Sequence, residues 1–147
     1  DIQDGMNVLD VGCGYGPIGL TAATLTPAGR VKMIDINERA VLLARKNLEM
    51  NHITNGEVVV SDLFSSVGED ERFDVIVTNP PIRAGKKIVH DIFVQAYQHL
   101  EKGGSLWVVI QKKQGAPSAM EKLEELFGRV EVPMKKKGYY ILHAEKQ

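Results

Sequence analysis

The sequence contains little from which a disulfide or a membrane-spanning segment could form. Cysteine occurs once, as Cys13, so no disulfide can form within the chain. The longest purely apolar runs, such as Leu106 to Ile110, have five residues, whereas a membrane span requires roughly 18. The first residues show neither the basic region nor the apolar region of a secretory signal. These absences predict a soluble protein of a reducing, cytoplasmic compartment.

A large net charge is also lacking, because 18 Lys and Arg residues balance 19 Asp and Glu residues to a formal charge of −1. The two parts of the chain nevertheless differ: residues 1–79 hold 6 basic and 12 acidic residues, whereas residues 80–147 hold 12 and 7. Such asymmetry can accompany an anionic partner, although solvated loops of opposite sign would give the same counts. With 147 residues, 44% of them hydrophobic, the chain can bury roughly 68–70% of its unfolded surface and form one domain without disulfides.

Segments with the apolar spacing of strands alternate along the chain with segments that have the spacing of helices. The expected strands are residues 7–11, 30–34, 57–60, 73–78, 105–110, 130–134 and 139–144. The expected helices are residues 18–25, 38–51, 88–100 and 118–127, with Asn37 and Ser118 as N-terminal caps and Gly103-Gly104 closing the third. Residues 63–72 are expected to be irregular. The alternation predicts an α/β fold with a doubly wound, mostly parallel seven-stranded sheet that ends in an antiparallel hairpin.

Three glycines follow the first expected strand, at the edge where such sheets bind ligands. Gly12, Gly14 and Gly16 allow backbone and ligand to approach closely, and the following helix supplies free N–H donors. Asp35 ends the second strand, 21 residues after Gly14, where a carboxylate can bind ribose hydroxyls. Gly14, Gly16 and Gly19 match the G-x-G-x-x-G of nicotinamide dinucleotide sites, whereas Gly12, Gly14 and Gly16 match the G-x-G-x-G of S-adenosylmethionine enzymes. The glycine pattern alone leaves both cofactors open.

Two further polar segments follow the third and fourth strands. Asp62 and Leu63 follow the third strand, where an acid can accept a hydrogen bond from an adenine amino group and a backbone N–H can meet a ring nitrogen. Asn79-Pro80-Pro81-Ile82 follows the fourth. The prolines stiffen the chain, so the Asn79 side chain and the Pro80 carbonyl can act as fixed acceptors for a planar exocyclic amine. Methyl transfer to such an amine needs orientation rather than a strong base, and hydride transfer has no use for this arrangement.

Taken together, these motifs resemble those of class I S-adenosylmethionine-dependent methyltransferases that methylate amino groups. The resemblance rests on residues 8–16 (VLDVGCGYG), Asp35, residues 61–63 (SDL) and residues 79–82 (NPPI). Residues 79–86 (NPPIRAGK), with Gln111 and residues 113–115 (KQG), are similar to the small methyltransferase domain shared with ribosomal RNA guanine-N2 methyltransferases. The resemblance implies a Rossmann-like methyltransferase fold in which residues 1–147 form a single methyltransferase domain, without the N-terminal segment that is usual in the family.

The resemblance also implies roles for individual residues of this sequence. Asp10 would orient the glycine turn, and Gly12, Gly14 and Gly16 would lie beside the methionine part of the cofactor. Asp35 would bind the ribose. The adenine would be bound by Ile36, Asp62 and Leu63. Asn79 and Pro80 would grip the target amine as catalytic residues. The substrate would be bound by Pro81, Ile82, Arg83, Lys86, Lys112 and Lys113. Ile82 stands where many relatives that methylate adenine or glutamine have Tyr or Phe, which leaves base stacking to other residues such as Tyr139 or Tyr140.

Three groups of basic residues follow the fourth, fifth and sixth strands. They are Arg83, Lys86 and Lys87, then Lys112 and Lys113, and then Lys135, Lys136 and Lys137. If the sixth strand is parallel to the others, all three groups lie at the ligand-binding edge and form a rim for RNA phosphates. The target base would have to leave its stack to reach Asn79. The four histidines, His52, His90, His99 and His143, show no metal-ligand spacing with one another or with Cys13, which is expected to fill space rather than to act as a nucleophile.

The sequence therefore predicts an S-adenosylmethionine-dependent N-methyltransferase that acts on an exocyclic amine. Guanine N2 of ribosomal RNA is the first candidate for the amine, and ribosomal RNA or a ribosomal subunit is the expected partner. The alternatives are adenine N6, a protein glutamine amide, a domain that binds RNA without catalysis, and a nicotinamide-dependent oxidoreductase. Neither a metal nor a membrane is expected to take part.

Overall fold

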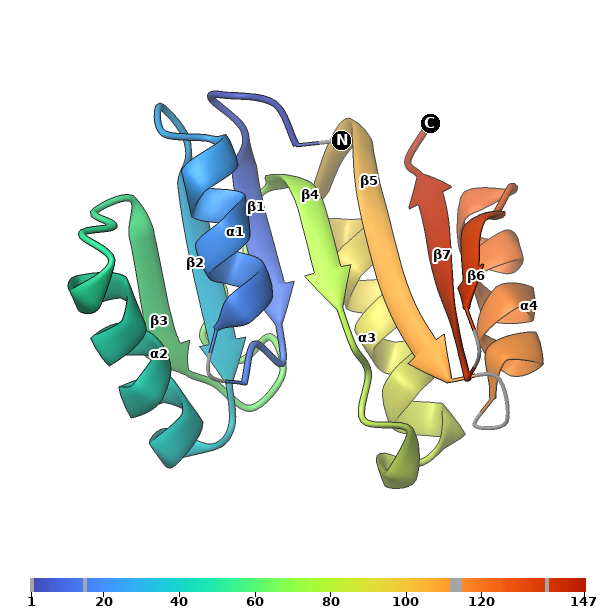
Figure 1. The fold of residues 1–147 in the computed structure, drawn as a ribbon. Coiled ribbons are helices and arrows are strands. Elements are labelled where there is room, and N and C mark those ends of the chain that lie inside the picture. Colours follow the sequence, from blue (N-terminus) through green and yellow to red (C-terminus); the bar gives the residue numbers. More distant parts are fainter. Residues whose placement is uncertain (1, 15, 112–114, 137) are drawn as a thin grey trace.

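The computed structural model describes residues 2–14, 16–111, 115–136 and 138–147 (Figure 1). Its strands are β1 (Asn7–Val11), β2 (Arg30–Asp35), β3 (Gly56–Val60), β4 (Phe73–Thr78), β5 (Leu100–Gln111), β6 (Glu131–Lys136) and β7 (Tyr139–Glu145). Its helices are α1 (Pro17–Leu25), α2 (Glu38–Met50), α3 (Lys86–His99) and α4 (Ala116–Phe127), with a 3-10 turn, η1, at Ile82–Ala84. The predicted alternation of strands and helices is confirmed.

All seven strands form one sheet in the order β3-β2-β1-β4-β5-β7-β6. The pairs from β3 through β5 are parallel. β7 runs antiparallel to both β5 and β6, so β6 is parallel to β5. The doubly wound sheet and the C-terminal hairpin are therefore confirmed. The strand order reverses between β1 and β4, and the carboxyl ends of strands at such a switch point are where open α/β sheets bind ligands.

Helices cover both faces of the sheet, as Figure 1 shows. On one face α1 and α2 bury Ala22, Ala23, Val41, Ala44 and Leu48 against β1, β2 and β3. On the other face α3 and α4 bury Val89, Ile92, Phe93, Ala96, Ala119, Leu123 and Phe127. Residues 61–72 form turns rather than a helix, as predicted for 63–72, and Phe64 and Val67 from this segment join the second cluster. A loop therefore covers the part of this face between β3 and β4.

The end of α3 differs from the prediction. The helix ends at His99, and Gly103-Gly104 do not close it but lie within β5. Gly103 has a φ of +86° and donates its N–H to the Lys146 carbonyl. The register between β4 and β5 shifts at the start of β5. The bond from Gly103 connects this irregular part of β5 to the end of the chain. The two glycines therefore lie in an irregular part of a strand, and β5 begins directly after α3 with no loop between them.

The start of α4 also differs, whereas that of α2 is as predicted. α4 begins after Gly115, which has a left-handed conformation, so Ser118 lies inside the first turn and is not the cap. The Ser118 hydroxyl instead lies 3.0 Å from Nε2 of His90 on α3. Asn37 caps α2, because its side chain accepts the Ala40 N–H at 3.1 Å. Within the described ranges, no helix combines the length and the apolar character needed to cross a membrane.

Candidate active site

The loop after β1 has a backbone conformation that glycine adopts readily and other residues do not. Gly12, Gly14 and Gly16 have φ values of +77°, +58° and +100°, where a Cβ atom would be strained. The N–H groups of Gly12 and Cys13 both donate to the Ile34 carbonyl, at 2.8 and 3.0 Å, which ties the loop to the end of β2. A Cβ at Gly12 would lie 3.8 Å from the carbonyl oxygen of Asn79. The glycine turn and the segment after β4 are therefore neighbours.

Asp35, at the end of β2, connects the glycine turn to two further loops. One of its carboxylate oxygens accepts the Gly14 N–H at 2.8 Å, and the other accepts the Asn37 N–H at 2.8 Å. Its backbone carbonyl accepts the Ser61 N–H at 2.9 Å. A carboxylate offers about four lone-pair positions, so both oxygens retain capacity to accept a hydrogen bond from a hydroxyl group.

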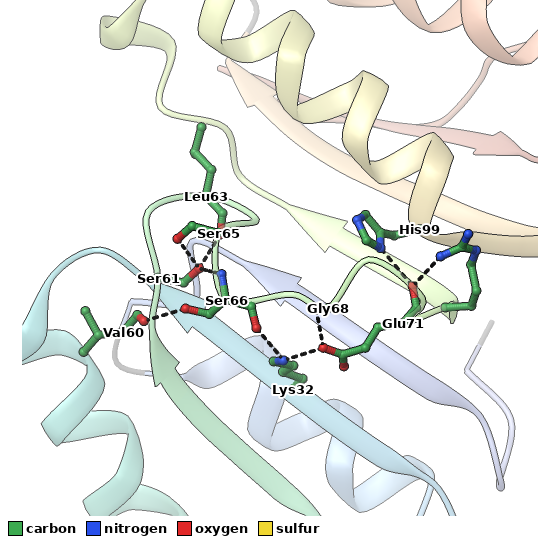
Figure 2. Close-up of polar contacts among 10 residues, drawn as sticks. Lys32, Val60, Ser61, Leu63, Ser65, Ser66, Gly68, Glu71 and His99 are labelled. Carbon is green, nitrogen blue, oxygen red and sulfur yellow. Dashed lines mark hydrogen bonds and ion pairs between the residues drawn. The ribbon is translucent and has the colours of Figure 1, made fainter.

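The turn after β3 presents Asp62 and Leu63. Leu63 has a φ of +53°, in the left-handed region. The Ser61 hydroxyl donates to the Leu63 carbonyl at 2.7 Å, a contact drawn in Figure 2. The Asp62 N–H donates to the Ser65 hydroxyl at 3.0 Å, and the Asp62 side chain is exposed. This turn is therefore held by serine hydroxyls from its own residues.

The segment after β4 leads directly into α3. Thr78, the last residue of β4, donates its hydroxyl to the Val11 carbonyl at 3.2 Å and so connects the ends of β4 and β1. Asn79 is exposed and Pro80 is buried. The Pro81 carbonyl accepts the Ala84 N–H at 2.9 Å within η1. The predicted role of Ile82 concerns a side chain outside those that the structure describes.

These four loops surround a cavity of about 490 Å³, which is within the range of small-molecule sites. The structure brings together seven of the predicted site residues in its wall: Gly12, Asp35, Ile36, Asp62, Leu63, Asn79 and Pro81. Sequence reasoning missed the apolar residues that η1 and α3 add to the wall, which are Ala84, Ile88 and Ile92. Ile88 and Ile92 are one helical turn apart, so the spacing reveals a shared face. It does not reveal that this face borders a cavity.

Six other predicted residues that the structure describes are not part of the cavity wall: Asp10, Gly14, Gly16, Pro80, Arg83 and Lys86. The Gly14 N–H donates a hydrogen bond to Asp35, which does line the cavity. Gly16 is buried, and a Cβ at this position would lie 3.2 Å from the Ala44 Cβ on α2. These contacts hold the glycine turn against Asp35 and α2.

Asp10 lies in β1 and is only 3% exposed. Burial, opposed by a hydrogen bond from the Gly19 backbone and reinforced by the charge of Asp35, raises the pKa of its carboxyl to about 7. Its Oδ2 atom has no hydrogen-bond partner among the described residues. Burial and the charges of Asp10 and Asp35 also raise the pKa of the Cys13 thiol to about 12. The thiol is therefore protonated at neutral pH and unsuited to nucleophilic attack.

Basic residues lie at the same edge of the sheet. Arg83, in η1, and Lys86 and Lys87, in the first turn of α3, are exposed. Because β6 is parallel to β5, Lys135 is also near this edge, and its Nζ lies 5.2 Å from the centre of the Tyr140 ring. Tyr139 pairs with Gln111 at the end of β5. Outside the described residues lie Lys112, Lys113 and Lys137, together with the side chain of Lys136.

A larger hollow, of about 650 Å³, lies at the opposite edge, beside the amino ends of the strands. Its wall mixes basic with acidic residues: Arg30, Lys32 and Arg72 with Glu57 and Glu71. Lys32 and Glu71 form an ion pair at 2.9 Å, also shown in Figure 2. Since parallel sheets bind ligands at the carboxyl ends of their strands, the smaller cavity is the candidate site. In the part of the chain that the structure describes, no three His, Cys, Asp or Glu residues are grouped to hold a metal ion.

Comparison with known sequences finds relatives of nearly the whole chain. The model of the Methyltransferase small domain family matches residues 2–143. The uncharacterised protein YbxB of Bacillus subtilis (strain 168) is 60% identical over 139 residues, which are 95% of this chain and 69% of that protein. Ribosomal RNA small subunit methyltransferase C of Vibrio cholerae is 33% identical over 143 residues, which are 95% of this chain and 40% of that protein.

Among solved structures, the fold matches that of the Thermus thermophilus 16S rRNA N2 methyltransferase RsmC, in complex with AdoMet and guanosine. The TM-score is 0.85 at 30% sequence identity, and the match covers 99% of this chain and 38% of that chain. The chain thus spans about two fifths of the length of these two rRNA methyltransferases. Because the family model covers the glycine turn, both acidic loops and the segment after β4, the ambiguity of the glycine pattern is removed. This chain is a methyltransferase domain and belongs to the Methyltransferase small domain family.

Proposed function

We propose that this domain transfers a methyl group from S-adenosylmethionine to an exocyclic amine, and that the amine is N2 of a guanine in ribosomal RNA. One observation carries the proposal. The glycine turn and the segment that would grip the amine share one cavity, with a Cβ at Gly12 placed 3.8 Å from the Asn79 carbonyl oxygen. A cofactor in the glycine turn and an amine at Asn79 would therefore be adjacent. The similarity to an N2 methyltransferase whose structure contains guanosine supports guanine as the target.

The residues of the cavity fit an adenosyl cofactor. Asp35 retains acceptor capacity for two ribose hydroxyls. Ile36, which is 67% exposed, and Leu63 offer apolar surface to an adenine ring, and the Asp62 carboxylate would accept its amino group. The unpartnered Oδ2 of Asp10, behind the glycine turn, is a further acceptor near the same loop. When bound, S-adenosylmethionine supplies the electrophilic methyl group.

Asn79 and Pro80 would orient the nucleophile. The amide oxygen of Asn79 and the carbonyl oxygen of Pro80 would each accept one N–H of the amine, which directs its lone pair toward the methyl group. The rings of Pro80 and Pro81 fix φ at both positions, so the backbone here is stiff and the acceptors keep their positions. Orientation is sufficient because the amine loses its proton after the new C–N bond forms.

RNA fits the exposed charge beside the cavity. Arg83, Lys86 and Lys87 come four to eight residues after Asn79 and would contact phosphates. Such contacts fix the position of the RNA without reading its sequence. Lys135 extends this basic surface along the same edge of the sheet. The target guanine would leave its stack to bring its amino group to Asn79.

Calorimetry with S-adenosylhomocysteine tests the cofactor. We expect the wild type to bind it and Asp35→Ala to bind it at least about tenfold more weakly, because two charge-assisted hydrogen bonds to ribose are lost. Asp70→Asn, which changes an exposed acid outside the cavity wall, is the matched control and should bind normally. Binding of NADH in place of S-adenosylhomocysteine would refute the cofactor assignment.

Transfer of a labelled methyl group to ribosomal subunits and to naked RNA, followed by nucleoside analysis, tests the target. We expect the label in N2-methylguanosine. Label in N6-methyladenosine or in protein glutamine would refute the proposed target. RNA binding with a steep salt dependence but without any label would identify a non-catalytic binding domain instead.

A further inference from the structure

Ser61 directly precedes Asp62 and Leu63, and its hydroxyl forms hydrogen bonds within the turn that presents them. It is 3% exposed, and its hydroxyl donates to the Leu63 carbonyl at 2.7 Å. The same oxygen accepts the Ser66 N–H at 3.0 Å and lies 3.4 Å from the Ser65 hydroxyl. Figure 2 shows these contacts converging on Ser61. A single buried hydroxyl therefore connects both sides of the turn.

The turn needs such a connection because Leu63 has a left-handed backbone conformation, with a φ of +53°. A bulky residue keeps this conformation only where its surroundings impose it. The bond from Ser61 holds the Leu63 carbonyl, and the Ser65 hydroxyl holds the Asp62 N–H. Among the described residues, neither the Leu63 N–H nor the Asp62 carboxylate has a hydrogen-bond partner. Both groups belong to residues that line the cavity.

Ser61 also fixes the turn relative to the ribose end of the cavity. Its backbone N–H donates to the Asp35 carbonyl at 2.9 Å, and the Asp35 carboxylate accepts the Gly14 N–H at 2.8 Å. Ser61 therefore belongs to a chain of hydrogen bonds that runs from the glycine turn to Leu63. A donor and an acceptor held in this way have a defined spacing from the site of the ribose.

We propose that Ser61 is a positioning residue for recognition of the adenine edge. By its hydrogen bonds to the Leu63 carbonyl and the Ser66 N–H, its hydroxyl fixes the shape of the turn. The Asp62 carboxylate and the Leu63 N–H then match the amino group and the neighbouring ring nitrogen of adenine, which produces a preference for adenine over hypoxanthine. The inference rests on the proposed function, because it requires an adenosyl cofactor. Hypoxanthine has an oxygen in place of the amino group and an N–H at the neighbouring ring position. The Asp62 carboxylate would therefore face the hypoxanthine oxygen, a second acceptor, and the Leu63 N–H would face the ring N–H, a second donor.

The test is calorimetry with S-adenosylhomocysteine and S-inosylhomocysteine, which differ only at this edge. We expect the wild type to prefer the adenine compound by at least about 100-fold. Ser61→Ala should reduce this preference by about tenfold or more, and Ser61→Cys, which fills the same space with a weak donor, should reduce it as well. Ser61→Thr keeps a hydroxyl and should retain most of the preference. Ser66→Ala is the matched control, because the Ser66 hydroxyl donates at 3.0 Å to the Val60 carbonyl, outside the Asp62–Leu63 turn.

The ratio of the two affinities separates positioning from folding, because a partly unfolded variant loses affinity for both compounds by the same factor. The inference is supported if the ratio falls in Ser61→Ala and Ser61→Cys and stays within about twofold in Ser66→Ala. An unchanged ratio in both Ser61 variants, or an equal fall in Ser66→Ala, would overturn it. A wild type that binds both compounds equally would overturn it and leave the cofactor assignment intact. A wild type that binds neither would overturn the proposed function and this inference together.

Discussion

Replacing Asp10 with Asn removes an ionisable group near the carboxyl end of β1 and keeps the size of the side chain. In the wild type, burial raises the pKa of this carboxyl to about 7, despite a hydrogen bond from the Gly19 backbone and with a contribution from the charge of Asp35. In the unfolded chain the carboxyl has its ordinary pKa of 3.8. The folded state therefore binds the proton more tightly than the unfolded state. The contribution of Asp10 to stability is complete below pH 3.8 and decreases as the pH rises through about 7.

The size of this effect follows from proton linkage. Between the two pKa values, each pH unit lowers the free energy of unfolding by about 1.4 kcal/mol. With a folded pKa of about 7, the loss between pH 5 and pH 7 is about 2 kcal/mol, because the slope flattens as the folded state begins to release its proton. Above about pH 8 the carboxyl is ionised in both states, and the loss ends.

Urea denaturation at pH 5, 6, 7 and 8 measures the effect as a difference between the wild type and Asp10→Asn, since the other titrating groups are common to both. Asp10→Asn should gain about 2 kcal/mol relative to the wild type from pH 5 to pH 7. Asp70→Asn, at an exposed position, should show no pH-dependent difference. Parallel pH profiles for the wild type and Asp10→Asn would refute the reasoning, because Asp10 would then be ionised in the folded protein.

Three further predictions concern the loop of residues 61–72, the proposed amine site at Asn79 and the basic residues beside the cavity. Burial alone would raise the pKa of Glu71, but hydrogen bonds from the Gly68 N–H at 2.7 Å and Lys32 at 2.9 Å lower it. Glu71→Gln should therefore reduce the free energy of unfolding by about 1 kcal/mol at pH 7 and by much less near pH 3, as measured by urea denaturation. Equal losses at the two pH values would contradict the lowered pKa. Asn79→Ala should bind S-adenosylhomocysteine normally in calorimetry and lose about 10²–10³-fold in labelled methyl transfer; unchanged turnover would remove Asn79 from the mechanism. Lys86→Ala should lower the salt dependence of RNA affinity by about one charge, whereas Lys46→Ala, an exposed change on α2, should leave the slope unaltered.

Much of the site could be predicted because each motif directly follows a strand. Periodicity identifies the strands, and parallel pairing brings their carboxyl ends to one edge, so Gly12, Asp35, Asp62 and Asn79 had to meet. The boundaries of α3 and α4 were less predictable. Local patterns predict that Gly103 ends a helix, because they do not reveal its bond to Lys146, 43 positions along the chain. Local patterns likewise predict Ser118 as the cap of α4, because they do not reveal its hydrogen bond to His90 on α3.

The sequence by itself determined the α/β class, the order of the motifs and the place of Asn79-Pro80-Pro81 directly after β4, because these depend on spacing between near neighbours and on the direction of parallel strands. Only the tertiary structure decided three other properties. They are the raised pKa of Asp10, the apolar cavity wall formed by Ala84, Ile88 and Ile92, and the hydrogen bonds of Ser61. The physical reason is that burial and cavity shape depend on segments distant in the chain, and that the partners of a short hydroxyl depend on the path of the folded backbone.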